Sequence, residues 1–158
     1  MKADTLTMAY IETLTDLLTP SHVHVRLRAT TKSALLAELA KRCAAASGVP
    51  EAALAAALAT REALGSTGFG HGVAVPHARL PGLTRPFCAV GVLDKPVAYD
   101  AVDGQPVDLV FLLLSPDGAS STHLALLAAA SRKLRQPDVA QAIRQASTPE
   151  AVVAALVG

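Results

Sequence analysis

A glycine-rich segment at residues 65–72 comes shortly before a histidine that could do chemistry. Four of its eight residues are glycine, and glycine lets a backbone adopt positive φ and turn its N–H groups toward a bound anion. The apolar run 73–75 is typical of a short buried strand, and Pro76 predicts the end of its hydrogen-bond ladder. His77 would then lie at the end of that strand.

His77 has the neighbours that a phosphoryl acceptor needs. Neutral imidazole is a good nucleophile near neutral pH, and Arg61 and Arg79 lie on either side of it in the sequence. A guanidinium group matches phosphate oxygens with two parallel hydrogen bonds. The segment has neither the Lys-Ser/Thr end of a Walker A loop nor G-x-G-x-x-G spacing, which argues against ATP as the direct donor. A loop without chemistry is the alternative that the residue types alone leave open.

The composition limits the classes of protein that the chain can belong to. Its 158 residues are enough for one domain with a sizeable core. A net charge of +1 gives no broad basic face for nucleic acid, and aromatic residues at 3% weaken any base-stacking role. The most apolar helix candidate, 51–60, is far shorter than a membrane span of roughly 20 residues, and 1–10 lacks the apolar core of a signal peptide. We therefore expect a cytoplasmic protein without membrane insertion, in which Cys43 and Cys88 are small buried residues that are not joined by a disulfide.

The apolar periodicity predicts alternating helices and strands. Residues 22–28 alternate between polar and apolar, which predicts a half-buried strand with Val23, Val25 and Leu27 on its inner face. His22 and His24 would share the other face, but no third ligand is nearby, so we expect a solvated face rather than a metal site. Apolar residues at helical spacing and helix-start residues predict helices at 32–47, 50–64 and 121–134, and two more that begin at 137 and 149. Apolar, β-branched runs predict strands at 87–93 and 107–114.

Two predicted helix ends carry candidate site residues. Arg61 falls in the last turn of its helix, where the macrodipole tolerates a cation, directly before the glycine-rich segment. His123 falls in the first turn of a helix that Ser121 or Thr122 would cap. There the dipole lowers the pKa of a histidine, and backbone N–H groups can bind an oxyanion.

Three polar residues near these segments have a simpler interpretation. Asp100 and Asp103 lie in the turn-rich connection 94–105, where aspartate is common, so we expect solvated turn residues rather than an acid and base pair. His71 lies within the glycine-rich segment and is interpreted as a loop residue.

Three blocks of sequence resemble one family, the type-2 enzyme IIA domains of the bacterial phosphoenolpyruvate-dependent phosphotransferase system. Residues 61–77 contain every fixed position of the pattern R-E-x-x-G-S-T-G-x-G-x-G-x-A-[IV]-P-H, which ends in that family's phosphorylated histidine. Residues 95–114 resemble the nitrogen-regulatory branch most closely. Residues 122–127 match the helix start that carries the family's second active-site histidine. The resemblance covers nearly the whole chain.

The resemblance implies a fold and a set of site residues. The fold would be an α/β sandwich with a mixed four- to five-stranded sheet flanked by helices, which the order of predicted elements also favours. Residues 1–10 would be a partly mobile leader and 11–158 a single domain. His77 would accept the phosphoryl group through Nε2, assisted by His123 and Arg61, with no metal and no cofactor. The implied phosphate-binding residues are Ser66, Thr67, Gly68, Gly70 and Arg79.

The resemblance leaves two main functions open. In the first, a regulatory enzyme IIA receives phosphate from an HPr-like carrier and binds target proteins, such as potassium-transport proteins or sensor kinases, according to its phosphorylation state. In the second, a fructose/mannitol-type enzyme IIA passes the group to a IIB domain. A regulator that binds without being phosphorylated is a third alternative. Regulatory members often have a glycine and a basic residue after the histidine, whereas this chain has Ala78 and Arg79, a pair that also occurs in sugar-type domains.

Overall fold

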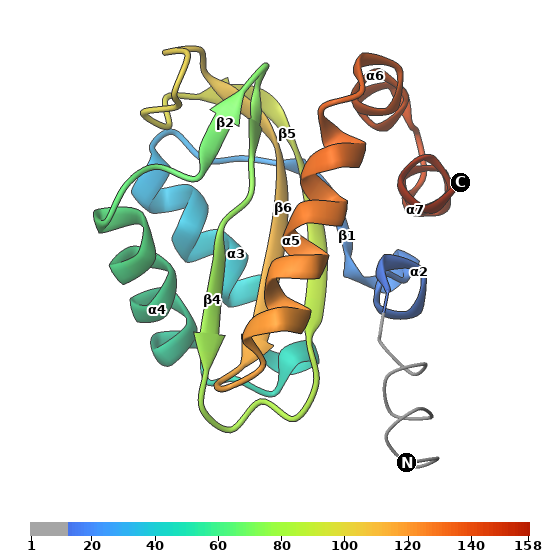
Figure 1. The fold of residues 1–158 in the computed structure, drawn as a ribbon. Helices are drawn as coiled ribbons and strands as arrows, with labels where there is room; N and C mark the ends of the chain where they lie inside the picture. The colour runs from blue at the N-terminus through green and yellow to red at the C-terminus, as the bar shows by residue number, and fades with distance from the viewer. Residues whose placement is uncertain (1–12) are drawn as a thin grey trace.

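The computed structural model describes residues 13–158 and has one mixed sheet with helices on both faces (Figure 1). The expected leader, 1–10, lies outside the described residues. The spatial order of the strands is β1-β5-β6-β3-β2. Strand β4 pairs with the same edge of β6 as β3 does, further along β6. Strands β5 and β6 are antiparallel, β1 is parallel to β5, and both β3 and β4 are parallel to β6. The strands are β1 (Val23–Leu27), β2 (Gly68–Gly70), β3 (Val73–Ala74), β4 (His77–Leu80), β5 (Phe87–Val97) and β6 (Val107–Pro116).

Helices cover the two faces of the sheet in two groups. Figure 1 shows α3 (Lys32–Ser47) and α4 (Glu51–Ala63) on one side. On the other side lie α2 (Leu14–Leu17), α5 (Ser120–Leu134), α6 (Pro137–Gln145) and α7 (Pro149–Val157), and a 3₁₀ helix, η1 (Pro20–His22), leads into β1. Alternate residues of β6 pack into the cores on opposite faces, as expected for a central strand. The predicted α/β architecture is confirmed.

Local capping sets the bounds of several helices. The Thr31 hydroxyl accepts a hydrogen bond from the Ala34 amide at 3.0 Å, and Gly48 ends α3 with a φ of 77°. Thr148 caps α7 in the same way. The start of α5 differs, because the helix begins at Ser120 without a side-chain cap, so the prediction that Ser121 or Thr122 caps it was wrong.

Pro76 does not end the pairing of its segment with the sheet. Strand β3 stops at Ala74, but β4 resumes the same parallel pairing with β6 from His77 onward. Proline lacks only the donor, and its carbonyl still accepts a hydrogen bond from the Leu113 amide at 3.1 Å. His77 therefore begins a strand instead of ending one, and the sheet has six strands rather than the four to five expected.

Strand β1 contains a bulge that the alternating pattern does not predict. Arg26 has a φ of 57°, and the register with β5 shifts between His24 and Leu27. As a result Val23 packs into the core beneath α5 to α7, whereas Leu27 packs beneath α3. The prediction of one apolar face over the whole segment was wrong, because the extra residue turns Leu27 to the other face.

Two further expectations concern burial and membranes. Cys43 and Cys88 are both buried and do not form a disulfide, as predicted. Among residues 13–158, no helix is long and apolar enough to cross a membrane.

Candidate active site

The ring of His77 is held in one orientation by a backbone carbonyl. Its Nδ1 lies 2.8 Å from the Val75 carbonyl oxygen. A carbonyl oxygen only accepts hydrogen bonds, so we assign the proton of the neutral ring to Nδ1 and the lone pair to Nε2. Arg61 donates a hydrogen bond from Nε to this Nε2 at 3.1 Å, which fits the same tautomer. Nε2 is therefore the ring nitrogen of His77 that keeps a lone pair.

Arg61 connects the glycine-rich segment to that nucleophile. It lies in the last turn of α4, and its Nη1 donates to the Gly65 carbonyl at 2.8 Å. The guanidinium group is thus fixed on one side by the loop and on the other by His77. A phosphoryl group on Nε2 would replace the Arg61 hydrogen bond and bring its oxygens next to the guanidinium.

His123 lies beside His77 and is buried. The ring centroids are 5.4 Å apart, and His123 Nδ1 lies 2.7 Å from the Ser115 hydroxyl oxygen. The pKa of His123 is lowered to about 4, chiefly by burial and in addition by the charges of His77 and Arg79. We expected the helix dipole to lower the pKa of His123, but burial is the larger cause. The His123 amide already donates to the Ala119 carbonyl at 2.9 Å, so it is not available to an oxyanion.

The pKa of His77 is also lowered. Burial is the main cause and the positive charge of Arg61 adds to it, while the hydrogen bond to Val75 and the charge of Glu62 oppose it. Both histidines of the site are therefore neutral at neutral pH. A neutral His77 keeps the lone pair that nucleophilic attack requires.

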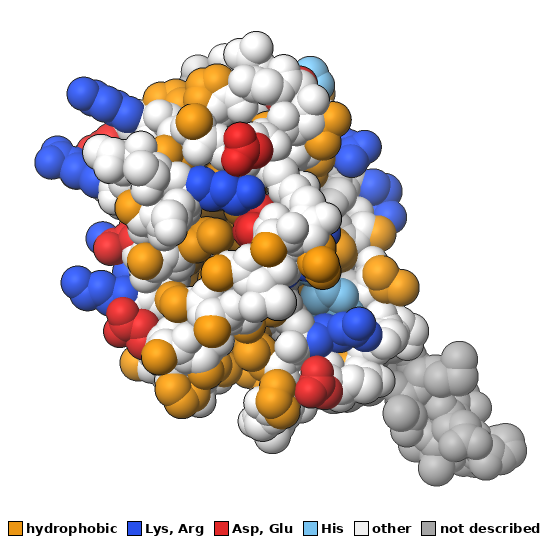
Figure 2. All heavy atoms as spheres, turned by 90° about the vertical axis from the view of Figure 1, so that its left-hand side faces the viewer, with side chains coloured by type: hydrophobic (Ala, Val, Ile, Leu, Met, Phe, Trp, Pro, Cys, Tyr) orange, Lys and Arg blue, Asp and Glu red, His pale blue; other side chains and the backbone are white. Residues whose placement is uncertain are grey.

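These residues line an open pocket of about 1070 Å³ between α4, β4 and the start of α5. Arg61, His77, Arg79 and His123 give it a polar floor. Leu64 and Leu124 lie at its rim and are 82% and 63% exposed. Figure 2, which views the molecule from the side of α4, shows a histidine between basic and apolar side chains. The arrangement is a basic, polar floor within an exposed apolar rim.

Arg79 is the fourth predicted site residue that the fold brings into this pocket. It is exposed, lies two residues after His77 on β4, and donates from Nη1 to the Ser120 hydroxyl at 2.6 Å. The start of α5 thus connects to β4 next to both histidines.

The other four predicted phosphate ligands do not line the pocket, because the loop uses them internally. The Ser66 hydroxyl donates to the Tyr99 carbonyl at 2.9 Å and accepts from the Gly68 amide at 3.1 Å. A Cβ atom on Gly68 would lie 2.9 Å from the Cβ of Ala101, and one on Gly70 would lie 3.3 Å from the Asp103 carboxylate. The glycines allow close packing against residues 99–103. A direct contact with phosphate remains a prediction for Ser66, Thr67, Gly68 and Gly70.

Glu62 lies near the site, and we predicted no role for it from the sequence. It is buried, and its carboxylate accepts hydrogen bonds from the Thr67 amide at 3.1 Å and the Tyr99 hydroxyl at 3.0 Å. The signal was present in the sequence, since Leu54, Leu58 and Glu62 are four residues apart and share the buried face of α4. A glutamate on such a face predicts buried partners.

The remaining candidates are loop residues. The Asp103 carboxylate accepts from the His71 amide at 2.9 Å and the Gln105 amide at 3.1 Å, and both Asp103 and His71 are exposed. Asp100 is exposed with a φ of 55°. The interpretation of these three as turn or loop residues is confirmed.

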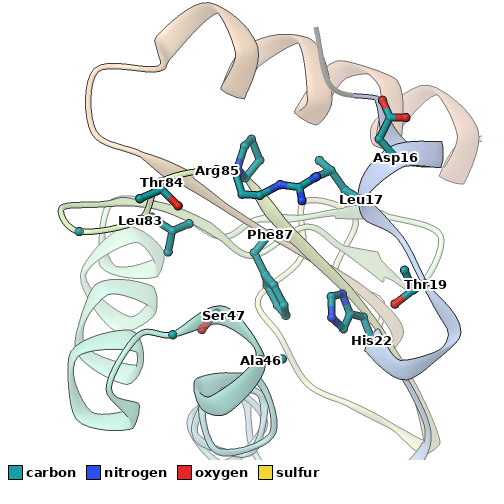
Figure 3. A pocket seen from close by; sticks show the side chains of 13 residues that line it. Asp16, Leu17, Thr19, His22, Ala46, Ser47, Leu83, Thr84, Arg85 and Phe87 are labelled. Carbon is teal, nitrogen blue, oxygen red and sulfur yellow. The ribbon is translucent and has the colours of Figure 1, made fainter. Parts of the chain in front are cut away.

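His22 and His24 do not form the shared solvated face that was expected. His22 lies in η1, and its ring packs 4.6 Å from that of Phe87 in a second pocket of about 450 Å³ (Figure 3). His24 lies in β1 and is half-buried, and burial is the main cause of its lowered pKa. Within the part of the chain that the structure describes, no three His, Cys, Asp or Glu residues are arranged to hold a metal ion.

The fold and site define the class of this protein. Residues 16–157 match the family "Phosphoenolpyruvate-dependent sugar phosphotransferase system, EIIA 2". The chain therefore belongs to this family of phosphotransferase components, and the resemblance inferred from the three sequence blocks is confirmed.

Individual relatives give a finer comparison. A protein named "Nitrogen regulatory protein" from Bradyrhizobium diazoefficiens is 42% identical over 143 residues, which are 90% of this chain and 94% of the relative. The crystal structure of nitrogen regulatory protein IIA-Ntr from Neisseria meningitidis matches with a TM-score of 0.87 at 34% identity, covering 91% of this chain and 99% of that one. IIA mannitol from Escherichia coli shares the fold, with a TM-score of 0.75 at 17% identity over 89% of this chain and 99% of that one.

Proposed function

We propose that His77 accepts a phosphoryl group at Nε2 from the phosphohistidine of an HPr-like carrier, and that the protein is a nitrogen/potassium-type regulatory enzyme IIA. The observation that carries the proposal is the hydrogen bonding of the His77 ring. Nδ1 is bound to the Val75 carbonyl, and Nε2 points to Arg61 at the floor of an open pocket.

The chemistry requires only proximity and charge stabilisation. The Nε2 lone pair attacks phosphorus in line, the bond from phosphorus to the carrier's imidazole nitrogen breaks, and its electron pair returns to that ring. The carrier's ring carries a proton on its second nitrogen, so it leaves as a neutral imidazole. The His77 ring keeps its Nδ1 proton, so it becomes positively charged and donates a stronger hydrogen bond to the Val75 carbonyl. No proton moves during the step.

Three side chains of the pocket would hold the phosphoryl oxygens. Arg61 contacts Nε2 directly, and Arg79 and His123 lie on the other elements that line the pocket. Such preorganised donors stabilise the charge that spreads over the transferring group. The exposed Leu64 and Leu124 would contact the carrier around the nucleophile.

The regulatory role is supported by the relatives rather than by the pocket. The two relatives at 42% and 34% identity both carry the name nitrogen regulatory protein. Phosphorylation would add negative charge at the floor of the pocket and change which target, such as a potassium-transport protein or a sensor kinase, can bind there.

The sugar-type alternative is favoured by one feature of the sequence, Ala78 and Arg79 after the nucleophile. In that case the phosphorylated protein would pass its group to a fructose- or mannitol-type IIB domain. Incubation of the phosphorylated chain with such a IIB domain distinguishes the two, since rapid transfer would favour the sugar-type role.

The acceptor is tested by intact mass after incubation with phosphoenolpyruvate, enzyme I and an HPr-type carrier. We expect the wild type to gain about 80 Da, the mass of an acid-labile HPO₃ group. His77→Ala should gain nothing. His71→Ala, which changes an exposed histidine of the neighbouring loop, is the matched control and should gain the same mass as the wild type. A wild-type chain that gains no mass with any carrier would contradict the proposal and favour the regulator that binds without being phosphorylated.

A further inference from the structure

We infer that Glu62 is a positioning residue for phosphoryl transfer, because its carboxylate fixes the loop that holds Arg61 against His77. The inference rests on the proposed function and deepens it. Glu62 does not line the pocket or contact Nε2, so its effect beyond the charge that raises the pKa of His77 would be exerted through the loop.

The carboxylate of Glu62 has its full set of donors. Oε1 accepts from the Thr67 amide at 3.1 Å and pairs with Lys32 Nζ at 2.8 Å. Oε2 accepts from the Tyr99 hydroxyl at 3.0 Å and from the Thr67 hydroxyl. All four groups donate, which matches an ionised carboxylate and not a protonated one. Burial by itself would raise the pKa of Glu62, but the hydrogen bonds from Lys32, Thr67 and Tyr99 together lower it.

Glu62 joins the end of α4 to the loop that follows it and to two segments that are distant along the chain. Lys32 is the first residue of α3, Glu62 lies in the last turn of α4, Thr67 lies in the glycine-rich loop, and Tyr99 follows β5. Lys32 also lies 4.5 Å above the Tyr99 ring. The Glu62 side chain is only 5% exposed, so solvent cannot readily replace these contacts.

Short contacts lead from this cluster to the nucleophile. The Gly65 amide donates to the Glu62 carbonyl at 3.1 Å, and Thr67, two residues later, is bound to the Glu62 carboxylate. The loop is therefore attached to Glu62 on both sides of Ser66. Between these attachments the Gly65 carbonyl accepts from Arg61 Nη1 at 2.8 Å, and Arg61 Nε contacts His77 Nε2 at 3.1 Å. Loss of the Glu62 contacts would release the Gly65 carbonyl that orients Arg61.

The kinetic test compares Glu62→Gln with the wild type in transfer from a phosphorylated HPr-type carrier. A glutamine amide cannot accept from all four donors, so the loop should lose its fixed position. A displacement of about 1 Å at a reacting centre costs on the order of a hundredfold in rate. We therefore expect the rate at saturating carrier to fall by about 10- to 100-fold. The KM for the carrier should stay within about twofold, because the rim that contacts it is unchanged.

Two further variants keep the result interpretable. Glu38→Gln removes a carboxylate of similar size from α3, where it pairs with Arg42 on the surface, and should leave the rate unchanged. Tyr99→Phe removes only one donor to Glu62 and should lower the rate in the same direction by a smaller factor. If Glu62→Gln does not fold, Tyr99→Phe decides the inference.

The second readout is the ¹⁵N chemical shift of the His77 ring in the unphosphorylated proteins. A merely structural role for Glu62 would lower the melting temperature but leave this signal unchanged in the folded variant. We expect the Nε2 resonance to shift in Glu62→Gln, because the Arg61 hydrogen bond is weakened, while Nδ1 stays protonated. A folded variant with a wild-type rate and a wild-type Nε2 resonance would overturn the inference. If the wild type accepts no phosphate at all, the proposed function fails, and the Nε2 resonance still decides the role of Glu62.

Discussion

At the scale of single residues, the protonation of the two histidines is the property on which the chemistry depends. Val75 fixes the tautomer of His77, and burial keeps both His77 and His123 neutral. The tautomer of His77 is set by a carbonyl two residues away, whereas the neutral state of both rings follows from packing. They also link the stability of the fold to pH.

The lowered pKa of His123 predicts a loss of stability in acid. The unfolded chain binds a proton at His123 near the ordinary histidine pKa of about 6.5, whereas the folded chain does so only near about 4. The stabilisation is therefore fully present above about pH 6.5 and is lost as the pH falls toward 4. Over that window His123 should account for about 2 to 3 kcal/mol of the lost unfolding free energy.

Urea denaturation at pH 7 and pH 4.5 measures this contribution. We expect His123→Gln, which does not titrate, to lose less stability than the wild type between the two values. Equal losses in the two proteins would show that His123 is exposed to solvent protons in the folded state.

At the scale of the elements, the glycine-rich loop is built by close packing against the turn at residues 99–103. Gly68 has a backbone that other residues could adopt, but a Cβ atom there would meet Ala101 and the Tyr99 ring at 2.9 to 3.1 Å. The loop therefore needs glycine at 68 for space and not for positive φ. Position 70, with a φ of 117°, requires glycine both for space and for positive φ.

Gly68→Ala should destabilise the protein by about 1 to 3 kcal/mol, the usual cost of overpacking. Ala101→Gly removes the Cβ atom nearest to the new methyl group. Gly68→Ala combined with Ala101→Gly should therefore recover part of the loss in a double-mutant cycle measured by chemical denaturation. Additive effects of the two substitutions would mean that the loop moves away from the turn instead of packing against it.

At the scale of the whole molecule, α4 and α5 come from opposite faces of the sheet and meet at the pocket above β4. This arrangement places Leu64 and Leu124 at its rim, although they are 60 residues apart in the sequence numbering. Both are exposed in the isolated chain. Exposed leucines around a polar floor are typical of a surface that is covered during binding.

Leu64→Asp should weaken docking of the carrier without changing stability. We expect the KM for an HPr-type carrier to rise by about tenfold, as for the loss of a well-packed interface residue. Val102→Asp is the matched control, because Val102 is also 82% exposed but does not line the pocket. A KM that rises equally in both variants would show a nonspecific effect of the added charge.

The sequence by itself determined the family, the longer helices and strands, and the position of the acceptor candidate. Those features depend on contacts between near neighbours, such as Thr31 with Ala34 at the start of α3, and on a motif that is continuous up to His77. The apolar run of β6 was equally clear, because a strand buried on both faces is apolar throughout.

Only the tertiary structure decided the state of the site and the faces of the strands. The separation of His77 and His123, the burial that keeps them neutral, and the partners of Glu62 all depend on residues that folding brings together. The bulge at Arg26, which turns Leu27 to the other face, breaks a regular pattern without any local marker. Hydrogen bonds along a helix are set by neighbouring residues, whereas burial and pKa are set by whatever packs against a side chain from distant segments.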